Sequence, residues 1–217
     1  MPKRVARLVS AILLAIGVSA CGSRFSHAAE FGGLSGEQSF PDDSLTDWVS
    51  LADQISVVRV VSDAPIPPPV PPATSGGYQG RRANFVVERT LWHAAGVTPK
   101  TEFSMVVAGW FTSGDGDRQE ACVEDDARIE VGDRYVFPLT HYEDGTLTSL
   151  ASGSLLPLNK VRGLGRFPDK ASGQLKGLTF DEMAARLADT PMDPIAKKYE
   201  DLTPYDRGRK MIEERYR

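Results

Sequence analysis

Short strand-like segments follow one another through the middle of the chain with no helical segment between them, and this restricts the possible folds most. Residues 55–61 are rich in β-branched side chains, and residues 84–91 alternate apolar with polar ones. Parallel neighbours would need long crossover connections, usually helices, which this region lacks. The sequence therefore predicts a mainly β fold, a small closed barrel of about six short strands. Further strands are expected at residues 103–110, 134–139, 146–150 and 154–158.

Turn and loop residues separate these segments. Asp144-Gly145 lies between two expected strands and predicts a hairpin, because Asp-Gly favours the tight turns that join antiparallel strands. Residues 65–77 are rich in proline and are expected to form a stiff extended loop that does not pair in a sheet. Residues 112–126 are expected to form an acidic loop.

Capping signals predict helices at both ends of the strand region. Ser44 with Asp47 resembles a capping box, and apolar residues follow at helical spacing. Thr179 with Glu182 repeats the pattern, and two cap-then-proline pairs, Asp193-Pro194 and Thr203-Pro204, predict two further helix starts. The sequence thus predicts a short N-terminal helix and a small helical C-terminal appendage, residues 161–217.

The N-terminus has the layout of an export signal. Residues 1–7 hold three basic side chains and no acid, and residues 8–20 form an apolar stretch too short to span a bilayer stably. The stretch ends Val18-Ser19-Ala20-Cys21, which resembles the lipobox of bacterial lipoproteins. The resemblance implies that residues 1–20 are a signal peptide and that Cys21 carries the lipid. The mature protein would then be tethered to the cell membrane on its extracytoplasmic side, with residues 21–43 as a flexible tether.

Two other interpretations of the cysteines stay open. An ordinary signal peptide cut after Ala28 would discard Cys21, because Ser26-His27-Ala28 also fits a cleavage site. Alternatively, Cys21 forms a disulfide with Cys122, the second cysteine of the chain. If Cys21 is lipidated, Cys122 has no partner and the body of the protein folds without an internal disulfide.

The charge of the chain restricts its partners. The whole chain has a formal net charge of −4, and removal of residues 1–20 leaves 22 basic and 29 acidic side chains, or −7. Nucleic-acid binding requires cations that displace counterions from phosphates. We therefore expect no nucleic-acid partner, and membrane attachment through lipid rather than through surface charge.

Residues 44–160 resemble a known kind of domain. Ala52-Asp53 precedes the first strand, residues 85–92 end a later one, and Val131-Gly-Asp-Arg-Tyr-Val-Phe137 opens another. This layout is similar to bacterial lipoproteins with an OB-like barrel, related to netrin-like and tissue-inhibitor-like domains. The resemblance implies an OB-like barrel over residues 44–160. The chain lacks the paired N-terminal cysteines of the animal inhibitors, so inhibitor activity does not carry over.

The residues with catalytic or metal-binding potential do not form a known pattern. His27, His93 and His141 lack zinc-ligand spacing, and no nucleophile or nucleotide-binding motif is present. Asp115-Gly-Asp117 offers oxygen ligands for Ca²⁺ but fails the EF-hand pattern, so a solvated loop is the favoured interpretation. We expect no metal, no cofactor and no enzymatic activity.

One pair of aromatic residues suggests a binding role. Trp110-Phe111 runs directly into the acidic loop, and exposed aromatic residues beside polar loops are common in recognition sites. The predicted binding residues are Trp110, Phe111, Asp115 and Asp117, beside the proline-rich loop, and the expected partner is an envelope protein or a glycan. Two alternatives remain. One is an envelope hydrolase that uses Asp115 and Glu120 as an acid pair. The other is a structural subunit that docks through helix 204–217.

Overall fold

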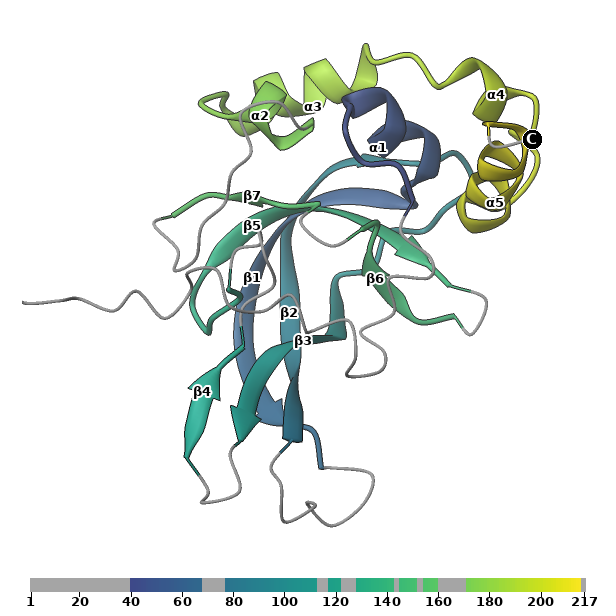
Figure 1. Cartoon of the computed structure of the whole chain (residues 1–217). Helices are drawn as coiled ribbons and strands as arrows, with labels where there is room; N and C mark the ends of the chain where they lie inside the picture. The colour runs from purple at the N-terminus through teal and green to yellow at the C-terminus, as the bar shows by residue number, and fades with distance from the viewer. Residues whose placement is uncertain are drawn as a thin grey trace, which may run out of the picture.

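The chain folds into one curled antiparallel sheet, a half-barrel, covered on one side by short helices (Figure 1). The computed structural model describes residues 40–67, 77–112, 117–121, 128–142, 145–151, 154–159 and 171–215. Within these ranges the strand order is β4-β3-β2-β1-β5-β6, and β7 also pairs with β5. The strands are β1 (Gln54–Pro65), β2 (Gly77–His93), β3 (Glu102–Thr112), β4 (Arg118–Glu120), β5 (Arg134–His141), β6 (Leu147–Ser149) and β7 (Leu156–Pro157). The prediction of a mainly β fold is confirmed.

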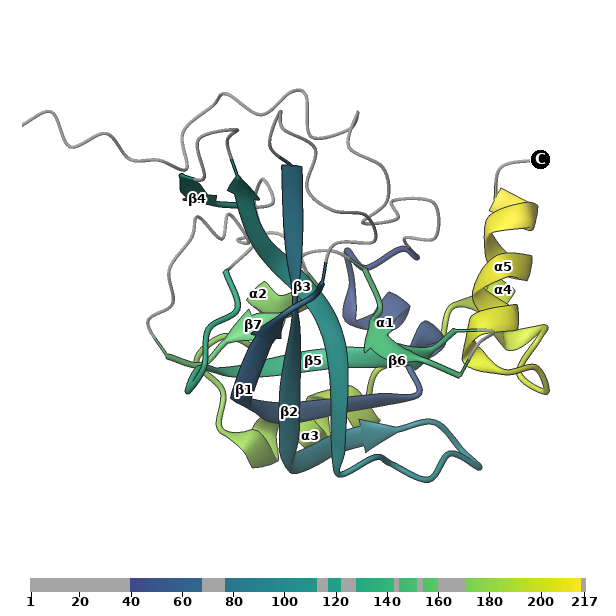
Figure 2. The ribbon, with the colours of Figure 1, turned by 90° about the horizontal axis from the view of Figure 1, so that it is seen from below.

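Strand β1 is the centre of the sheet because both of its edges are paired. Over Gln54–Arg59 it pairs with β5 on one side, and along its whole length it pairs with β2 on the other. The β1–β2 register shifts at three points, and such irregularities bend and twist a strand. The sheet therefore curls, and Figure 2 shows β5 running across the direction of β2 and β3. Residues of β3 also come into contact with β6.

The inner side of the curl is filled by one hydrophobic cluster. Its members are Val58, Val60, Ala83, Phe85, Met105, Val107, Ile129, Tyr135, Phe137, Leu139, Leu147 and Leu155. The ring of Phe85 stacks on Phe103 at 4.8 Å between centroids and meets Phe137 edge-on at 5.8 Å. Aromatic pairs in these geometries stabilise by about 0.5–1.5 kcal/mol beyond their buried area.

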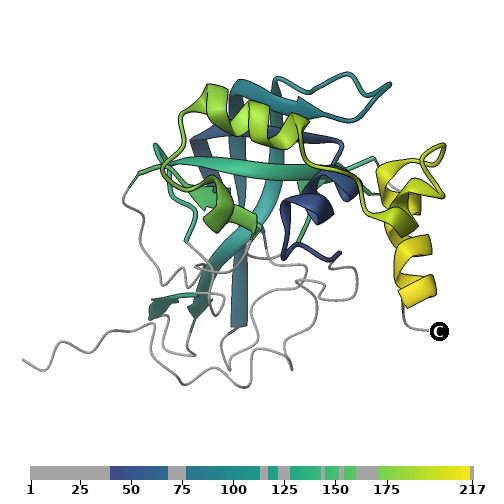
Figure 3. The ribbon, with the colours of Figure 1, turned by 90° about the horizontal axis from the view of Figure 1, so that it is seen from above.

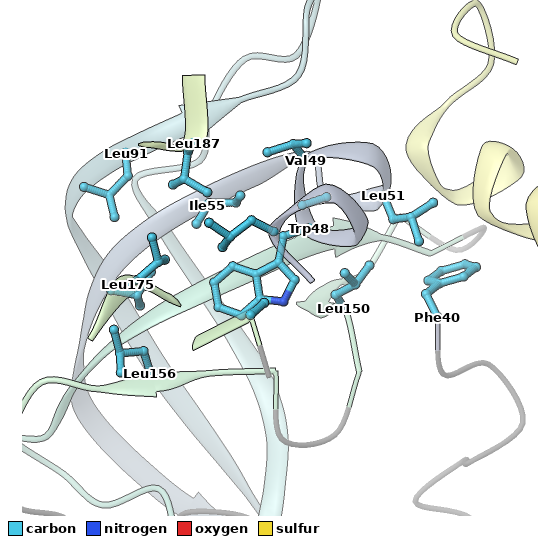
Figure 4. Packing of buried hydrophobic residues seen from close by; sticks show 14 of the residues in the cluster. Phe40, Trp48, Val49, Leu51, Ile55, Leu91, Leu150, Leu156, Leu175 and Leu187 are labelled. Atoms are coloured by element: carbon cyan, nitrogen blue, oxygen red, sulfur yellow. The ribbon is translucent and has the colours of Figure 1, made fainter. Parts of the chain in front are cut away.

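The outer side of β1 and β5 is covered by helices (Figure 3). Helices α1 (Leu45–Leu51), α2 (Ala171–Leu175) and α3 (Phe180–Ala188) lie over the sheet, and α4 (Pro194–Lys197) and α5 (Pro204–Arg215) lie at its side, in contact with α1. Trp48 of α1 is 1% exposed and packs in the same cluster as Ile55 of β1, Leu175 of α2 and Leu187 of α3 (Figure 4). Among the described residues, none of these helices is long and apolar enough to cross a membrane.

The C-terminal helices share this cluster with the sheet. Tyr205 and Met211 of α5 lie in it, and Gly208 approaches Phe40 so closely that an added Cβ would stand 2.5 Å from the Phe40 ring. Removing α5 would therefore take core residues away. A truncation after Leu202 is for this reason a poor test of whether the helix docks a partner.

Most helices and strands lie where the sequence predicts them, with three differences. Both ends of the proline-rich segment 65–77, which the sequence predicts not to pair, lie in strands: Pro65 pairs with Arg81 and Gly77 pairs with Thr112. A proline is tolerated at a strand end. Strand β4 lies inside the expected acidic loop, and the sequence pattern did not predict α2. Gly145, with φ +78°, supports the expected hairpin between β5 and β6. Residues 68–76 lie outside the described residues.

Ser50, in the last turn of α1, connects three helices. Its hydroxyl accepts from the backbone N–H of Asp193 at 2.8 Å, and its carbonyl accepts from Nη1 of Arg207 at 2.8 Å. The Arg207 guanidinium also donates to the carbonyls of Tyr199, Glu200 and Leu202. Burial lowers the pKa of Arg207, and the nearby carboxylates of Asp53 and Glu200 act in the opposite direction. Arg207 thus anchors α5 through backbone oxygens rather than through a direct ion pair.

We expect Arg207→Met to lower the free energy of unfolding by about 2–4 kcal/mol, because buried carbonyl oxygens lose their donors. Arg209→Met, exposed on the same helix, is the matched control and should change stability by roughly 0.5 kcal/mol or less. Urea unfolding followed by circular dichroism measures both. Equal losses for the two variants would show that Arg207 does not anchor the helix.

Candidate functional site

Three of the four predicted binding residues, Trp110, Phe111 and Asp117, lie in or beside β3 and β4, at the end of the sheet away from the helices (Figure 1). Trp110 and Phe111 are near the end of β3, opposite Glu120 and Gln119 of β4. Successive side chains of a strand point to opposite faces, so the two aromatic residues do not form one surface. Asp117 immediately precedes β4 and is exposed. Asp115, Cys21 and Cys122 lie outside the described residues.

The Trp110 side chain is surrounded by arginines. The guanidinium carbons of Arg81 and Arg118 lie 5.5 Å from the centre of the Trp110 ring, and that of Arg128 lies at 5.9 Å. A guanidinium this close to the face of a tryptophan is attracted by the ring quadrupole. We call these four residues the Trp110–arginine cluster. Because several guanidinium groups already lie against the ring, Trp110 is not an open platform for stacking a sugar.

Arg81 is held from several directions. Its side chain is 2% exposed, Nε donates to the carbonyl of Ala108 at 2.9 Å, and Nη2 donates to that of Ile129 at 2.7 Å. Nη1 forms a short ion pair with Asp63 of β1. A buried charge is tolerated only when it is paired and hydrogen-bonded, and Arg81 meets both conditions.

Arg128 joins the cluster from the segment before β5. Its Nε donates to Glu130 at 2.6 Å, and Nη1 donates to the carbonyls of Gly109 at 3.0 Å and Ala121 at 2.8 Å. Gly109 itself permits a very close approach of β2, since an added Cβ would lie 1.8 Å from the carbonyl oxygen of Gln79. Arg128 therefore fixes the ends of β3 and β4 relative to each other.

Arg118 differs from the other two arginines. It is exposed at the start of β4 and its guanidinium lies over the Trp110 ring, yet within the described residues this guanidinium has no hydrogen-bond acceptor or ion-pair partner. Nη2 of Arg128 likewise has no acceptor there, because the bonds of Arg128 run through Nε and Nη1. An exposed guanidinium that lies over an aromatic ring and has unused N–H donors can donate hydrogen bonds to oxygen atoms of a partner.

The site is not a cationic patch. The three arginines are accompanied by four carboxylates, Asp63, Asp117, Glu120 and Glu130, so the formal sum is 3 − 4 = −1. A polyanion would gain little electrostatic attraction here. The unused donors therefore favour a single oxygen-bearing group rather than a chain of phosphates.

The opposite face of the same strand end is aromatic. The ring of Phe111 lies 5.5 Å from that of Tyr78, and the Tyr78 hydroxyl accepts from the backbone N–H of Gly109 at 3.1 Å. Side chains of Ile66, Val106 and Tyr78 converge at Gly80, where an added Cβ would stand 3.4, 3.6 and 3.7 Å from them. Phe111 thus belongs to a small apolar surface on the outer side of the sheet.

A histidine–aspartate pair lies at the other end of the sheet. Nδ1 of the His141 ring stands 3.4 Å from the carboxylate of Asp53. The same carboxylate accepts hydrogen bonds from the backbone N–H of His141 at 2.7 Å and from the Thr140 hydroxyl at 3.1 Å. The hydroxyl bonds to the carboxylate rather than to the imidazole. This geometry therefore differs from a nucleophile–base–acid relay, in which the imidazole receives the hydroxyl proton.

Other candidate sites offer little chemistry. The part of the chain that the structure describes has no group of three or more His, Cys, Asp or Glu side chains able to hold a metal ion. An open depression of about 520 Å³ lies between α1, α2 and α3. It is lined by Ser44, Leu45, Thr46, Gln174, Arg186, Asp189, Thr190 and Pro191. The hydrolase alternative predicts an acid pair of Asp115 and Glu120. Glu120 lies 3.8 Å from Nε of Arg128, and Asp115 lies outside the described residues.

A comparison of the chain with protein-family models, with curated proteins and with solved structures finds no match.

The sequence pattern did not predict that arginines would lie around Trp110. Arg81 stands at an inward position of β2, and its only local sign is its place next to Arg82 in an alternating strand. Arg128 and Glu130 are two residues apart, a spacing that places both on one face of an extended segment. Their acceptors come from distant residues, so no local pattern marks the cluster.

We expect Arg128→Met to destabilise the protein by about 2–4 kcal/mol, because the buried carbonyls of Gly109 and Ala121 would lose their donor and the half-buried Glu130 its ion pair. Arg118→Met is the matched control and should cost about 0.5–1 kcal/mol, the value of an exposed cation–π contact. The free energies of unfolding in urea measure both. A similar cost for both variants would mean that Arg128 does not hold the strand ends.

Proposed function

We propose that this chain is the precursor of a bacterial lipoprotein, cleaved before Cys21 and anchored through lipid on that residue. Support comes from the basic residues 1–7, the apolar stretch 8–20 and the sequence Val18-Ser19-Ala20-Cys21. Two acyl chains give stable anchoring where one is marginal, at about 0.8 kcal/mol per buried methylene. The folded body then faces the extracytoplasmic side on the tether of residues 21–43.

We further propose that residues 44–160 form an OB-like barrel. Its support is a curled antiparallel sheet in which β1 pairs with both β2 and β5. The approach of β3 to β6 is the second support, because it brings strands from opposite halves of the sheet together.

The proposed activity is non-enzymatic binding of an envelope partner at the β3–β4 end. The observation that carries it is the exposed Arg118 guanidinium, which lies on Trp110 with its hydrogen-bond donors unused. The buried arginines Arg81 and Arg128 hold the ring and the strand ends in place around it. Of the two expected partner classes, the covered ring of Trp110 favours a protein over a glycan.

We expect Cys21→Ala to lose membrane association, because the acyl anchor is its only strong attachment. Wild type should sediment with membranes, resist carbonate extraction and dissolve in detergent. Cys122→Ser, which alters the other cysteine, should behave as wild type. Cell fractionation with immunoblotting and mass measurement of the membrane form distinguish the cases. A Cys21→Ala protein that stays with the membrane would contradict lipid anchoring.

Partner capture tests the binding role. Cross-linking in intact cells, affinity capture and mass spectrometry are compared for wild type, Arg118→Glu and Arg186→Glu, an exposed control on α3. We expect a reproducible set of envelope proteins that Arg118→Glu reduces about tenfold, since it reverses the charge at the site. If Arg186→Glu reduces the same proteins equally, the β3–β4 end is not the binding surface.

A further inference from the structure

Strand β4 is the terminal strand in the strand order of the sheet. Its inner edge pairs with β3, and within the described residues no strand pairs with its outer edge. All three residues, Arg118, Gln119 and Glu120, are exposed. An open strand edge presents unpaired backbone N–H and C=O groups, which can pair with another extended chain.

We propose that two copies of this chain pair through β4, antiparallel and about a two-fold axis at Gln119. In this register Arg118 of each copy lies directly opposite Glu120 of the other, and the two Gln119 residues face each other. Opposite charges directly across an antiparallel pair are favourable, and the self-complementary patch is what a two-fold interface requires. The inference rests on the proposed binding role of the β3–β4 end and names a second copy as the partner.

The sequence of β4 selects this arrangement over others. A parallel, in-register pair would place Arg118 against Arg118 and Glu120 against Glu120, and like charges directly opposite are unfavourable. A one-residue shift would set Gln119 against a charged side chain and turn the charged residues to opposite faces. Only the antiparallel register centred on Gln119 gives every charge of the strand an opposite charge.

The side chains are already placed for this pairing. Arg118 and Glu120 point to the same face of β4, where Trp110 holds the Arg118 guanidinium at 5.5 Å. The Glu120 side chain is 48% exposed and 3.8 Å from Arg128 of its own copy. In the pair, each Glu120 would lie between its own Arg128 and Arg118 of the second copy. Arg118 would thereby gain the acceptor that it lacks among the described residues.

The interface between the two copies is small, so we expect weak association. Short, charged edge strands normally discourage pairing, and the negative body adds repulsion that salt screens beyond about 8 Å. We therefore expect a reversible pair that depends on local concentration. Tethering both copies to one membrane raises that concentration.

The first experiment is site-specific cross-linking of the full chain in its membrane. Gln119→Cys, in a Cys122→Ser background, is treated with a short bis-maleimide, because directly opposite Cβ atoms in antiparallel strands lie about 4.5–5.5 Å apart. Two epitope tags on co-expressed copies identify a dimer of this chain. Asp189→Cys, exposed at the end of α3, is the matched control. We expect a doubly tagged dimer for Gln119→Cys and only background for Asp189→Cys.

Charge reversal in the Gln119→Cys chain is the second experiment. Arg118→Glu alone and Glu120→Arg alone should each reduce the dimer about tenfold, because two attractive pairs become repulsive. Co-expression of these two variants should restore it, since each then presents the charge that the other needs. Restoration also shows that both variants are folded.

The outcomes separate this inference from the proposed function. No dimer above background, or equal dimer in all charge variants, overturns the pairing through β4. If Gln119→Cys instead cross-links to a different envelope protein, the binding role stands and the self-pairing fails. A charge-dependent dimer without any other captured protein supports the pairing and identifies the partner as the second copy.

Discussion

The fold depends on the double burial of β1. Its residues alternate between two hydrophobic clusters, with Ile55 and Val57 on the helical side and Val58 and Val60 on the inner side. Its edges are also both paired, with β2 and β5. Over Gln54–Val58 both faces and both edges of β1 are covered, and a one-residue slip there would exchange the two clusters, so the register is strongly specified. The helices and the curl of the sheet are therefore arranged around one strand.

The helices and strands that the sequence predicts are those that form through interactions or patterns among residues close together in the chain. Capping pairs such as Ser44 with Asp47 form within four residues, and both hydrogen bonds of that box are present. Alternation and β-branching likewise indicate β1, β2 and β3. Strand β4 has no such pattern, because its three polar residues become a strand only through pairing with the end of β3. The helix α2 forms where Ala171 and Leu175 pack into the core beside α1, and its five residues are too few to show a helical repeat in the sequence.

The sequence pattern singled out Trp110 of the candidate site but not the arginines around it, and the difference has a physical reason. Trp110 stood out because large aromatic residues beside polar loops are visible in a sequence. The arginines did not, because an arginine in a strand normally indicates a solvated position and its burial requires acceptors from elsewhere. Arg81 finds them in Ala108, Ile129 and Asp63, which lie 18 to 48 positions away. A site built from such long-range hydrogen bonds becomes visible only after the strands are placed.

The two ends of the sheet use buried cations differently. At the helical end, the Arg207 guanidinium donates its hydrogen bonds to backbone carbonyls and so attaches α5 to α1. At the other end, Arg81 and Arg128 donate to carbonyls and also form ion pairs with Asp63 and Glu130, and their guanidinium groups lie beside Trp110 together with that of the exposed Arg118. Replacing buried ion pairs by apolar residues of similar volume is often neutral or stabilising, so stability alone does not account for two of them beside one ring. Their geometric effect is to fix where the exposed guanidinium stands, and the proposed binding role depends on this fixed position.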